Sequence, residues 1–285
     1  MTDKVLVFDV LGDFGFFKTP EVTRATLSFP FTRTSIIGLI GAMIGKEKNS
    51  YWEIDDPLGN SEIAIQLLNL GENSEFQHAP LTVNYAHTKY TVNIGGRSGT
   101  LKTYLSDGEK RGFVTDVKLD LLRDVHYRIY YKLPEKEIDQ ELYDKLKRYL
   151  KNNWSIFPTY LGHANLLADI IYIGEYPIKK IPNDIERISS VIPVSCIDQN
   201  YLNILERKVS IIMNIPIRME MKDTKIVNTF GENFILPGGK ESNLKIKVKN
   251  DVDIYSVEIK IADNKSEVLN IIFIPNGKDL ISEEI

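Results

Sequence analysis

The chain contains a single cysteine, Cys196, among its 285 residues. One thiol cannot form an internal disulfide and cannot supply a zinc site that needs several cysteines. No stretch reaches the ~18 consecutive apolar residues of a membrane span. The apolar run at the amino terminus is interrupted by Asp9 and Asp13, which indicates a strand and not a signal peptide. We therefore expect a cytoplasmic protein with no membrane segment.

The sequence also lacks the short motifs of several enzyme classes. It contains no Walker loop, no G-x-S-x-G, and no histidine pair at the spacing of metal ligands. We therefore expect no catalytic residue, no metal site and no cofactor. Metal-free RNA cleavage is the alternative, because it needs only a general base and a general acid. His87 with Lys89 and Tyr90, or His126 with Tyr130, could take those roles.

Charge of one sign is not in large excess, because the formal net charge is −4. The hydrophobic content of 43% is ordinary for a globular protein. No basic surface is evident from the total charge. A local basic surface can still coexist with an acidic remainder, so nucleic-acid binding stays open.

The stretch of residues 27–45, LSFPFTRTSIIGLIGAMIG, predicts a buried helix around which the chain is organised. Thr34 or Ser35 can cap its amino terminus, and apolar residues then surround it on all sides. The amino terminus of a helix favours an anion. Arg33 at that end, with Arg24 and Lys18 upstream, therefore predicts a phosphate-binding site. The alternative is a solvated Arg33 beside a core helix.

The order of predicted elements indicates a ferredoxin-like α+β fold. Residues 5–11, 63–70, 125–133 and 166–174 have strand patterns, and residues 138–150 have the pattern of an amphipathic helix. The order β-α-β, insertion, β-α-β is that of the double βαβ unit. We expect this domain to cover residues 1–175. Prolines and further strand patterns then predict a smaller, mostly β carboxy-terminal subdomain over residues 176–285.

The insertion between the second and third strands, residues 72–124, predicts a protruding β-arm. Structureless loops of this length are uncommon in compact domains unless they are functional. A glycine-rich tip lies near residues 95–99, and cationic and aromatic side chains are dense throughout. Candidate RNA-binding residues of the arm are Tyr85, His87, Lys89, Arg97, Lys102 and Arg111. A solvated, flexible insertion is the alternative.

The strand at residues 125–133 is expected to present two different faces, because side chains alternate along a strand. Its odd positions are apolar and predict a core face. Its even positions include Arg128, Tyr130 and Lys132, a basic and aromatic set suited to single-stranded RNA. The alternative is an exposed face that is basic without binding anything.

Residues 12–17 (GDFGFF), 28–34 (SFPFTRT) and 37–42 (IGLIGA) resemble the amino terminus of a CRISPR-associated family, the fifth family of Cas proteins in the RAMP superfamily. The match is closest to the type I-B branch and covers roughly the first 45 residues. Residues 160–163 (YLGH) resemble a second signature of that family.

The resemblance implies a non-catalytic subunit of the type I effector complex Cascade that binds the 5′ handle of the CRISPR guide RNA (crRNA). Implied partners are the backbone subunit, whose filament this subunit would cap, the large subunit, and target DNA near the handle-proximal end. Gly12 and Gly15 would pass close to the handle, and Gly162 and His163 could contact a handle base, although a turn that serves only packing fits equally well. In the type I-C branch the equivalent subunit cuts precursor guide RNA, which keeps the endoribonuclease alternative open.

Overall fold

The structure is a computed structural model of the whole chain. It describes residues 3–18, 28–69, 78–86, 92–94, 97–99, 114–132, 137–183, 188–198, 210–222, 225–236, 247–261 and 265–281. No helix within these ranges is long and apolar enough to cross a membrane.

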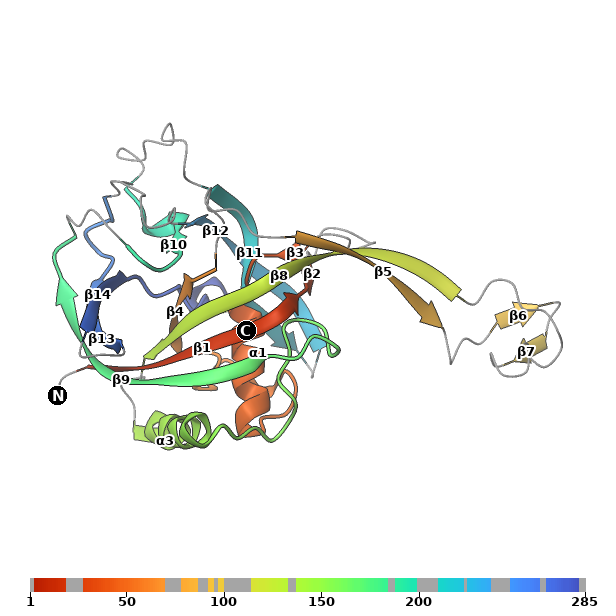
Figure 1. Ribbon diagram of the computed structural model, residues 1–285, viewed down its shortest axis with the longest axis horizontal. Coiled ribbons are helices and arrows are strands. Elements are labelled where there is room, and N and C mark those ends of the chain that lie inside the picture. Colours follow the sequence, from red (N-terminus) through yellow and green to blue (C-terminus); the bar gives the residue numbers. More distant parts are fainter. Residues whose placement is uncertain are drawn as a thin grey trace.

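A central antiparallel sheet carries the double βαβ unit. Its strands are β1 (Lys4–Gly15), β4 (Glu62–Leu67), β8 (Val114–Lys132) and β9 (Asp169–Ile181), in the order β9-β1-β8-β4. Helix α1 (Arg33–Ile44) connects β1 to β4, and helix α3 (Glu137–Asn152) connects β8 to β9. This order, with the chain's first and third core strands in the middle, confirms the predicted ferredoxin-like fold. Both helices lie on one side of the sheet (Figure 1).

Short elements complete the chain. They are β2 (Phe17–Lys18), β3 (Ser28–Phe29), η1 (Ser50–Trp52), η2 (Val194–Cys196) and η4 (Lys278–Leu280).

Helix α1 is buried as expected, but its cap differs from the predicted one. Thr32 is the N-cap residue, and its hydroxyl oxygen accepts a hydrogen bond from the Ser35 amide at 3.0 Å. The helix ends at Gly45, whose φ of 76° closes the last turn. Helix α3 buries Tyr143, Leu146 and Leu150 in the same core. The two helices therefore form one layer, which packs against the sheet.

The carboxy-terminal third, predicted as a subdomain that begins at residue 176, is joined to the central sheet by strand pairing. That boundary falls inside β9, whose last residues pair with β13 (Ile254–Ile261), which in turn pairs with β14 (Lys265–Ile271). After β14, the amide of Ile274 donates to the Ile63 carbonyl of β4 at 2.9 Å. The sheet therefore curls until its two ends meet.

A second sheet of three strands packs on the helix side. It comprises β10 (Ile192–Pro193), β11 (Ser210–Lys222) and β12 (Lys225–Leu236). Ile215, Ile217, Phe234 and Leu236 from this sheet belong to the same core cluster as α1. The main core therefore needs residues from both ends of the sequence.

The predicted β-arm is present between the second and third core strands. Strand β8 continues far beyond the core and pairs with β5 (His78–Ala86) as a two-stranded ribbon. A small hairpin of β6 (Val92–Ile94) and β7 (Arg97–Gly99) brackets the predicted glycine tip. Figure 1 shows this ribbon extending away from the body of the molecule, with the hairpin at its far end.

Candidate nucleic-acid interface

The arm has an unusual composition for a chain of negative net charge. No Asp or Glu occurs between Glu75 and Asp107, although the chain holds 39 carboxylates. The same stretch holds histidines, lysines, an arginine and tyrosines. Strand β8, which pairs with β5, brings Asp116 and Asp120 into the ribbon, so the positive excess is confined to residues 76–106.

The structure places some of the predicted arm residues and not others. Tyr85 lies in β5 opposite Thr115 of β8, and Arg97 lies in β7 opposite Ile94. His87, Lys89, Lys102 and Arg111 lie outside the described residues, as does Arg24 upstream of helix α1.

Arg33, the central residue of the predicted phosphate site at the start of α1, is fully buried and does not reach the surface. Its guanidinium donates to the carbonyls of Ile217 at 2.8 Å, Gly59 at 3.0 Å and Ser61 at 2.6 Å. Burial, followed by the neighbouring Arg218 cation, lowers the pKa of Arg33 to about 9. The side chain therefore joins the helix to β11 and to the loop before β4.

Thr34 and Ser35, two further residues of that predicted site, are also engaged in contacts within the fold. Thr34 is buried, and the Ser35 amide is occupied by the Thr32 cap. Lys18, at the end of β2, is exposed. Of the described residues in this set, Lys18 alone presents a charge to solvent.

The predicted basic face of β8 is largely covered, which corrects the expectation that Tyr130 and Lys132 are open to RNA. Tyr130 is fully buried, and Lys132 is 8% exposed. The Lys132 ammonium pairs with Glu62 at 2.9 Å and lies 5.2 Å from the ring centre of Tyr255. The curled carboxy-terminal strands supply this cover, so both faces of β8 are core at this point.

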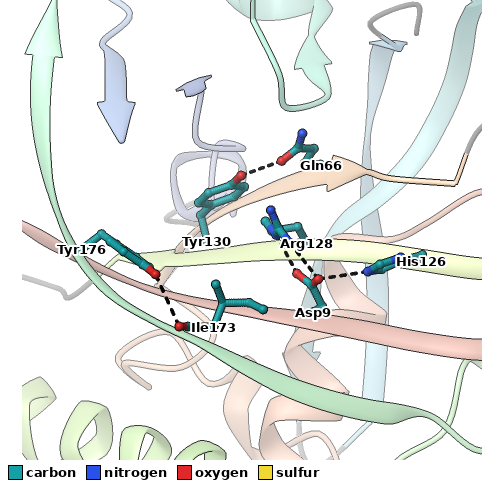
Figure 2. Close-up of polar contacts among 7 residues, drawn as sticks. All are labelled: Asp9, Gln66, His126, Arg128, Tyr130, Ile173 and Tyr176. Atoms are coloured by element: carbon teal, nitrogen blue, oxygen red, sulfur yellow. Dashed lines mark hydrogen bonds and ion pairs between the residues drawn. The ribbon is translucent and has the colours of Figure 1, made fainter. Parts of the chain in front are cut away.

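The other end of the predicted basic face of β8, around His126 and Arg128, does carry polar groups near the surface. There β1, β8 and β4 lie side by side (Figure 2). Asp9 faces Arg128 across the β1–β8 ladder. The Arg128 guanidinium binds both Asp9 oxygens, at 2.7 and 2.9 Å, and His126 Nε2 lies 3.0 Å from the same carboxylate. Cross-strand neighbours at this spacing interact directly.

The electrostatics of this cluster follow from its geometry. Burial works to raise the pKa of Asp9, but hydrogen bonds from His126 and Arg128 outweigh it and leave the pKa below its ordinary value. Arg128 uses two nitrogens on Asp9, so the guanidinium is held in place and is not a free phosphate ligand. The His126 side chain is 30% exposed and is the most accessible member.

Figure 2 also shows two neutral contacts on the same face. The Tyr130 hydroxyl donates to Gln66 Oε1 at 2.6 Å, and the Tyr176 hydroxyl lies 3.4 Å from the Ile173 carbonyl. Tyr130 belongs to the apolar cluster between the central sheet and the carboxy-terminal strands, and Tyr176 packs against that cluster. Asp9 and Gln66 were missed by sequence reasoning; the signal for Asp9 was a lone carboxylate inside an otherwise apolar strand.

Residues 12–15 of the predicted glycine loop are the end of strand β1, and Phe17 begins β2. Gly12 pairs with Val125 and Gly15 with Leu122 on β8. A side chain at Gly12 would meet the Leu161 side chain, so the glycine serves close packing.

Gly162, at the second signature, has a φ of 81°, and a Cβ there would collide with the Phe16 carbonyl. The packing alternative stated for this turn therefore accounts for Gly162. His163, the next residue, is half-buried.

Sequence reasoning also missed an exposed aromatic segment after helix α3. Trp154, Phe157 and Tyr160 are 55%, 50% and 43% exposed. Phe157 and Tyr160 line an open groove of about 740 Å³ against the small residues Gly38 and Ala42 of α1. The signal in the sequence was a cluster of large apolar residues in a stretch without carboxylates.

No group of His, Cys, Asp and Glu suited to hold a metal ion occurs among the described residues. Cys196 is buried, and burial raises the pKa of its thiol to about 11.

Comparisons with known proteins give structural neighbours only. No family model and no curated protein sequence matches the chain. A structure described as a CRISPR RNA-guided surveillance complex is 10% identical, with a TM-score of 0.46, over 81% of this chain and 88% of that chain. A CRISPR protein from Archaeoglobus fulgidus is 13% identical, with a TM-score of 0.42, over 94% and 99%.

A third structure, described as a Cas protein, is 16% identical, with a TM-score of 0.30, over 56% of this chain and 57% of that chain. The matched region thus spans little more than half of that third protein. These neighbours are CRISPR-associated proteins at low sequence identity.

Proposed function

We propose that this chain is a non-catalytic, crRNA-binding subunit of a type I CRISPR effector complex, of the I-B branch. It would hold the 5′ handle of the guide RNA and cap the filament of backbone subunits. It would also contact the large subunit and the target DNA near the handle-proximal end. The observation that carries the proposal is the β-arm, a two-stranded ribbon rooted in a ferredoxin-like core, in which the stretch from residue 76 to residue 106 contains no carboxylate.

The physical argument rests on where the arm is anchored. Strand β8 runs without interruption from the buried centre of the sheet into the ribbon. Its core half pairs with β1 and β4, and its outer half pairs with β5. A cationic and aromatic surface on such a support meets an RNA strand with little loss of chain entropy. The resemblance of residues 12–42 to the fifth Cas family supports the handle as the target.

The structure gives a specific reason to favour binding over cleavage at His126. The His126 Nε2 atom is engaged by Asp9, and its suggested partner Tyr130 is fully buried with its hydroxyl on Gln66. A general acid and base must both reach the scissile phosphate. This pair does not meet that requirement.

The arm can be tested by removing its outer part, beyond the β5–β8 ribbon, at a point that the structure defines. Ala86 and Val114 are directly paired, so a two-residue Asn-Gly turn can replace residues 87–113 and close the ribbon as a hairpin. We expect filter binding of handle RNA to weaken at least about tenfold, because the arm's phosphate and stacking contacts are lost. Unchanged handle binding in this variant would overturn the proposal.

Two charge-reversed double variants form a matched test and control. The test variant, Arg97→Glu with Lys102→Glu in the arm, should weaken handle binding. The control, Lys225→Glu with Lys265→Glu, changes two exposed lysines of other strands and should not weaken it. Incubating the wild-type chain with repeat RNA in a chelator tests the second part of the proposal. Specific cleavage there would establish the endoribonuclease alternative.

A further inference from the structure

Helix α3 and the segment after it form a rigid surface that the arm does not include. The amide of Phe157 donates to the Ala42 carbonyl at 3.1 Å, and the amide of Ile156 donates to the Met43 carbonyl at 3.0 Å. These two bonds satisfy carbonyls in the last turn of α1, which a helix end otherwise leaves free. The Trp154 amide is likewise bonded to the Tyr149 carbonyl at 2.9 Å. The aromatic side chains are therefore presented on a backbone fixed at both ends.

Cations accompany these aromatic side chains. The Trp154 ring meets Tyr149 edge to face at 6.1 Å between centroids. Lys145 Nζ and Arg148 Cζ each lie 5.9 Å from the Tyr149 ring centre. Lys151, in the last turn of α3, is exposed. This surface carries rings and positive charge side by side.

The segment that carries the rings contains no acidic residue. No Asp or Glu occurs between Asp144 and Asp169 in a chain that holds 39 of them. Across the groove, Lys46 and Lys48 accompany Glu47, and Lys46 is paired with Asp56. The positive charge near the rings thus belongs mainly to α3 and to Lys48.

The groove is lined by both small and aromatic residues. Gly38 and Ala42 of α1 line it together with Tyr51, Phe157 and Tyr160. Aromatic walls stack on any base because every base offers a π-face. Aromatic residues and arginine are also common at protein interfaces, so it is the lysines beside the rings that favour a nucleic acid here.

We propose that Trp154, Phe157 and Tyr160, hereafter the aromatic platform, bind single-stranded nucleic acid without reading its sequence. One base lies in the groove between Phe157, Tyr160 and Tyr51, and a neighbouring base stacks on Trp154. Lys48 and Lys151 meet the phosphates. The platform is separate from the arm and does not depend on the assignment of the handle RNA.

The two tryptophans of the chain make a direct test possible. Trp52 is buried at 2% exposure and Trp154 is 55% exposed, so a change in exposed tryptophan emission reports on Trp154. We expect 12-residue oligouridylate and oligoadenylate to quench that emission at low salt. Filter binding of the same oligonucleotides measures the variants that lack this ring. Trp154→Ala should weaken binding about tenfold, as expected for the loss of one stacked base, and Trp154→Phe should retain most of it.

Matched variants separate the platform from general effects. Val268→Ala removes an exposed apolar side chain on β14 and should leave binding unchanged. Lys48→Gln with Lys151→Gln should reduce the salt dependence of binding, by about 0.7 in the log–log slope for each lost phosphate contact. Thermal melting of every variant establishes that the fold is retained.

The arm-replaced variant distinguishes this inference from the proposed function. Quenching by the oligonucleotides should persist in that variant even where handle binding is lost. Absence of quenching in the wild-type chain, or wild-type affinity in Trp154→Ala, would overturn the inference and leave the platform as a surface for a protein partner. Loss of handle binding only in the platform variants would support the inference and count against the arm.

Discussion

At the scale of single residues, the charged groups inside the sheet decide which surfaces remain open. Asp9 is 4% exposed and is neutralised by two neighbours on β8. Such a pair contributes little over an apolar replacement, but removing one partner leaves a buried charge uncompensated. The Asp9 carboxylate acts here mainly by positioning its partners, because it fixes the Arg128 side chain and orients the His126 ring.

Asp9→Asn is expected to lower the free energy of unfolding by about 3 kcal/mol at neutral pH, because Arg128 loses its counter-charge. Urea denaturation measures the loss. An isosteric variant at an exposed acid, Asp13→Asn, should change stability by less than about 0.5 kcal/mol.

The same pair predicts a dependence on pH. The folded-state pKa of Asp9 lies below its ordinary value of 3.8, so the unfolded chain takes up the proton first as the pH falls. The stabilisation is therefore complete above about pH 5 and is lost as the pH falls through the folded-state pKa. The difference in stability between wild type and Asp9→Asn should shrink below about pH 4, and a difference that stays constant to pH 2 would contradict this account.

Arg33 gives the third prediction at this scale. Arg33→Met should lower the free energy of unfolding by about 3 kcal/mol, because three buried carbonyls lose their donor while the cost of burying a cation is removed. Handle binding per folded molecule should stay at the wild-type value. A stable variant that loses RNA affinity would restore the phosphate site predicted from the sequence.

At the scale of elements, sequence patterns correctly predicted those helices and strands that are determined by residues close together in the chain. The amphipathic period placed a helix at residues 138–150, and α3 spans Glu137–Asn152. The strand pattern at residues 5–11 falls within β1. Both patterns depend on neighbours a few residues apart.

Burial by distant segments could not be predicted in the same way. The bond from Arg33 to Ile217 spans 184 positions, and the cover over Lys132 comes from Tyr255 and Phe273. The predicted alternation of side chains between the two faces of β8 was correct. Which face is exposed to solvent, however, depends on strands that follow more than a hundred residues later. Sequence pattern alone contains no such information.

Turn geometry gives the prediction at this scale. Gly162→Ala should lower the free energy of unfolding by more than about 2 kcal/mol, because a positive φ and a collision with the Phe16 carbonyl act together. Gly38→Ala is the control, since its Cβ would meet only the Tyr51 hydroxyl at 3.2 Å, and a helix gains from alanine. Equal stability of the two variants, measured by thermal melting, would contradict the turn geometry.

At the scale of the whole molecule, the chain is one cooperative body with one projection. The sheet closes on itself through Ile274 and Ile63, and the second sheet completes the core over α1. The arm is the only long extension among the described strands in Figure 1. The described arm contributes little to the main core, so we expect that the arm can be exchanged without disturbing the core.

This arrangement predicts that the fragment 1–175 does not fold, although the sequence suggested an independent domain there. Without the rest of the chain, the core loses Ile215, Ile217, Phe234 and Leu236. Burial of a large apolar side chain contributes roughly 1.5–3 kcal/mol, so the loss is comparable to the whole stability of a typical domain, about 5–15 kcal/mol. Circular dichroism should show no cooperative thermal transition for the fragment, whereas the full chain under the same conditions should show one. A cooperative transition in the fragment would mean that α1 and the sheet suffice for a core, and the carboxy-terminal third would then be an accessory layer.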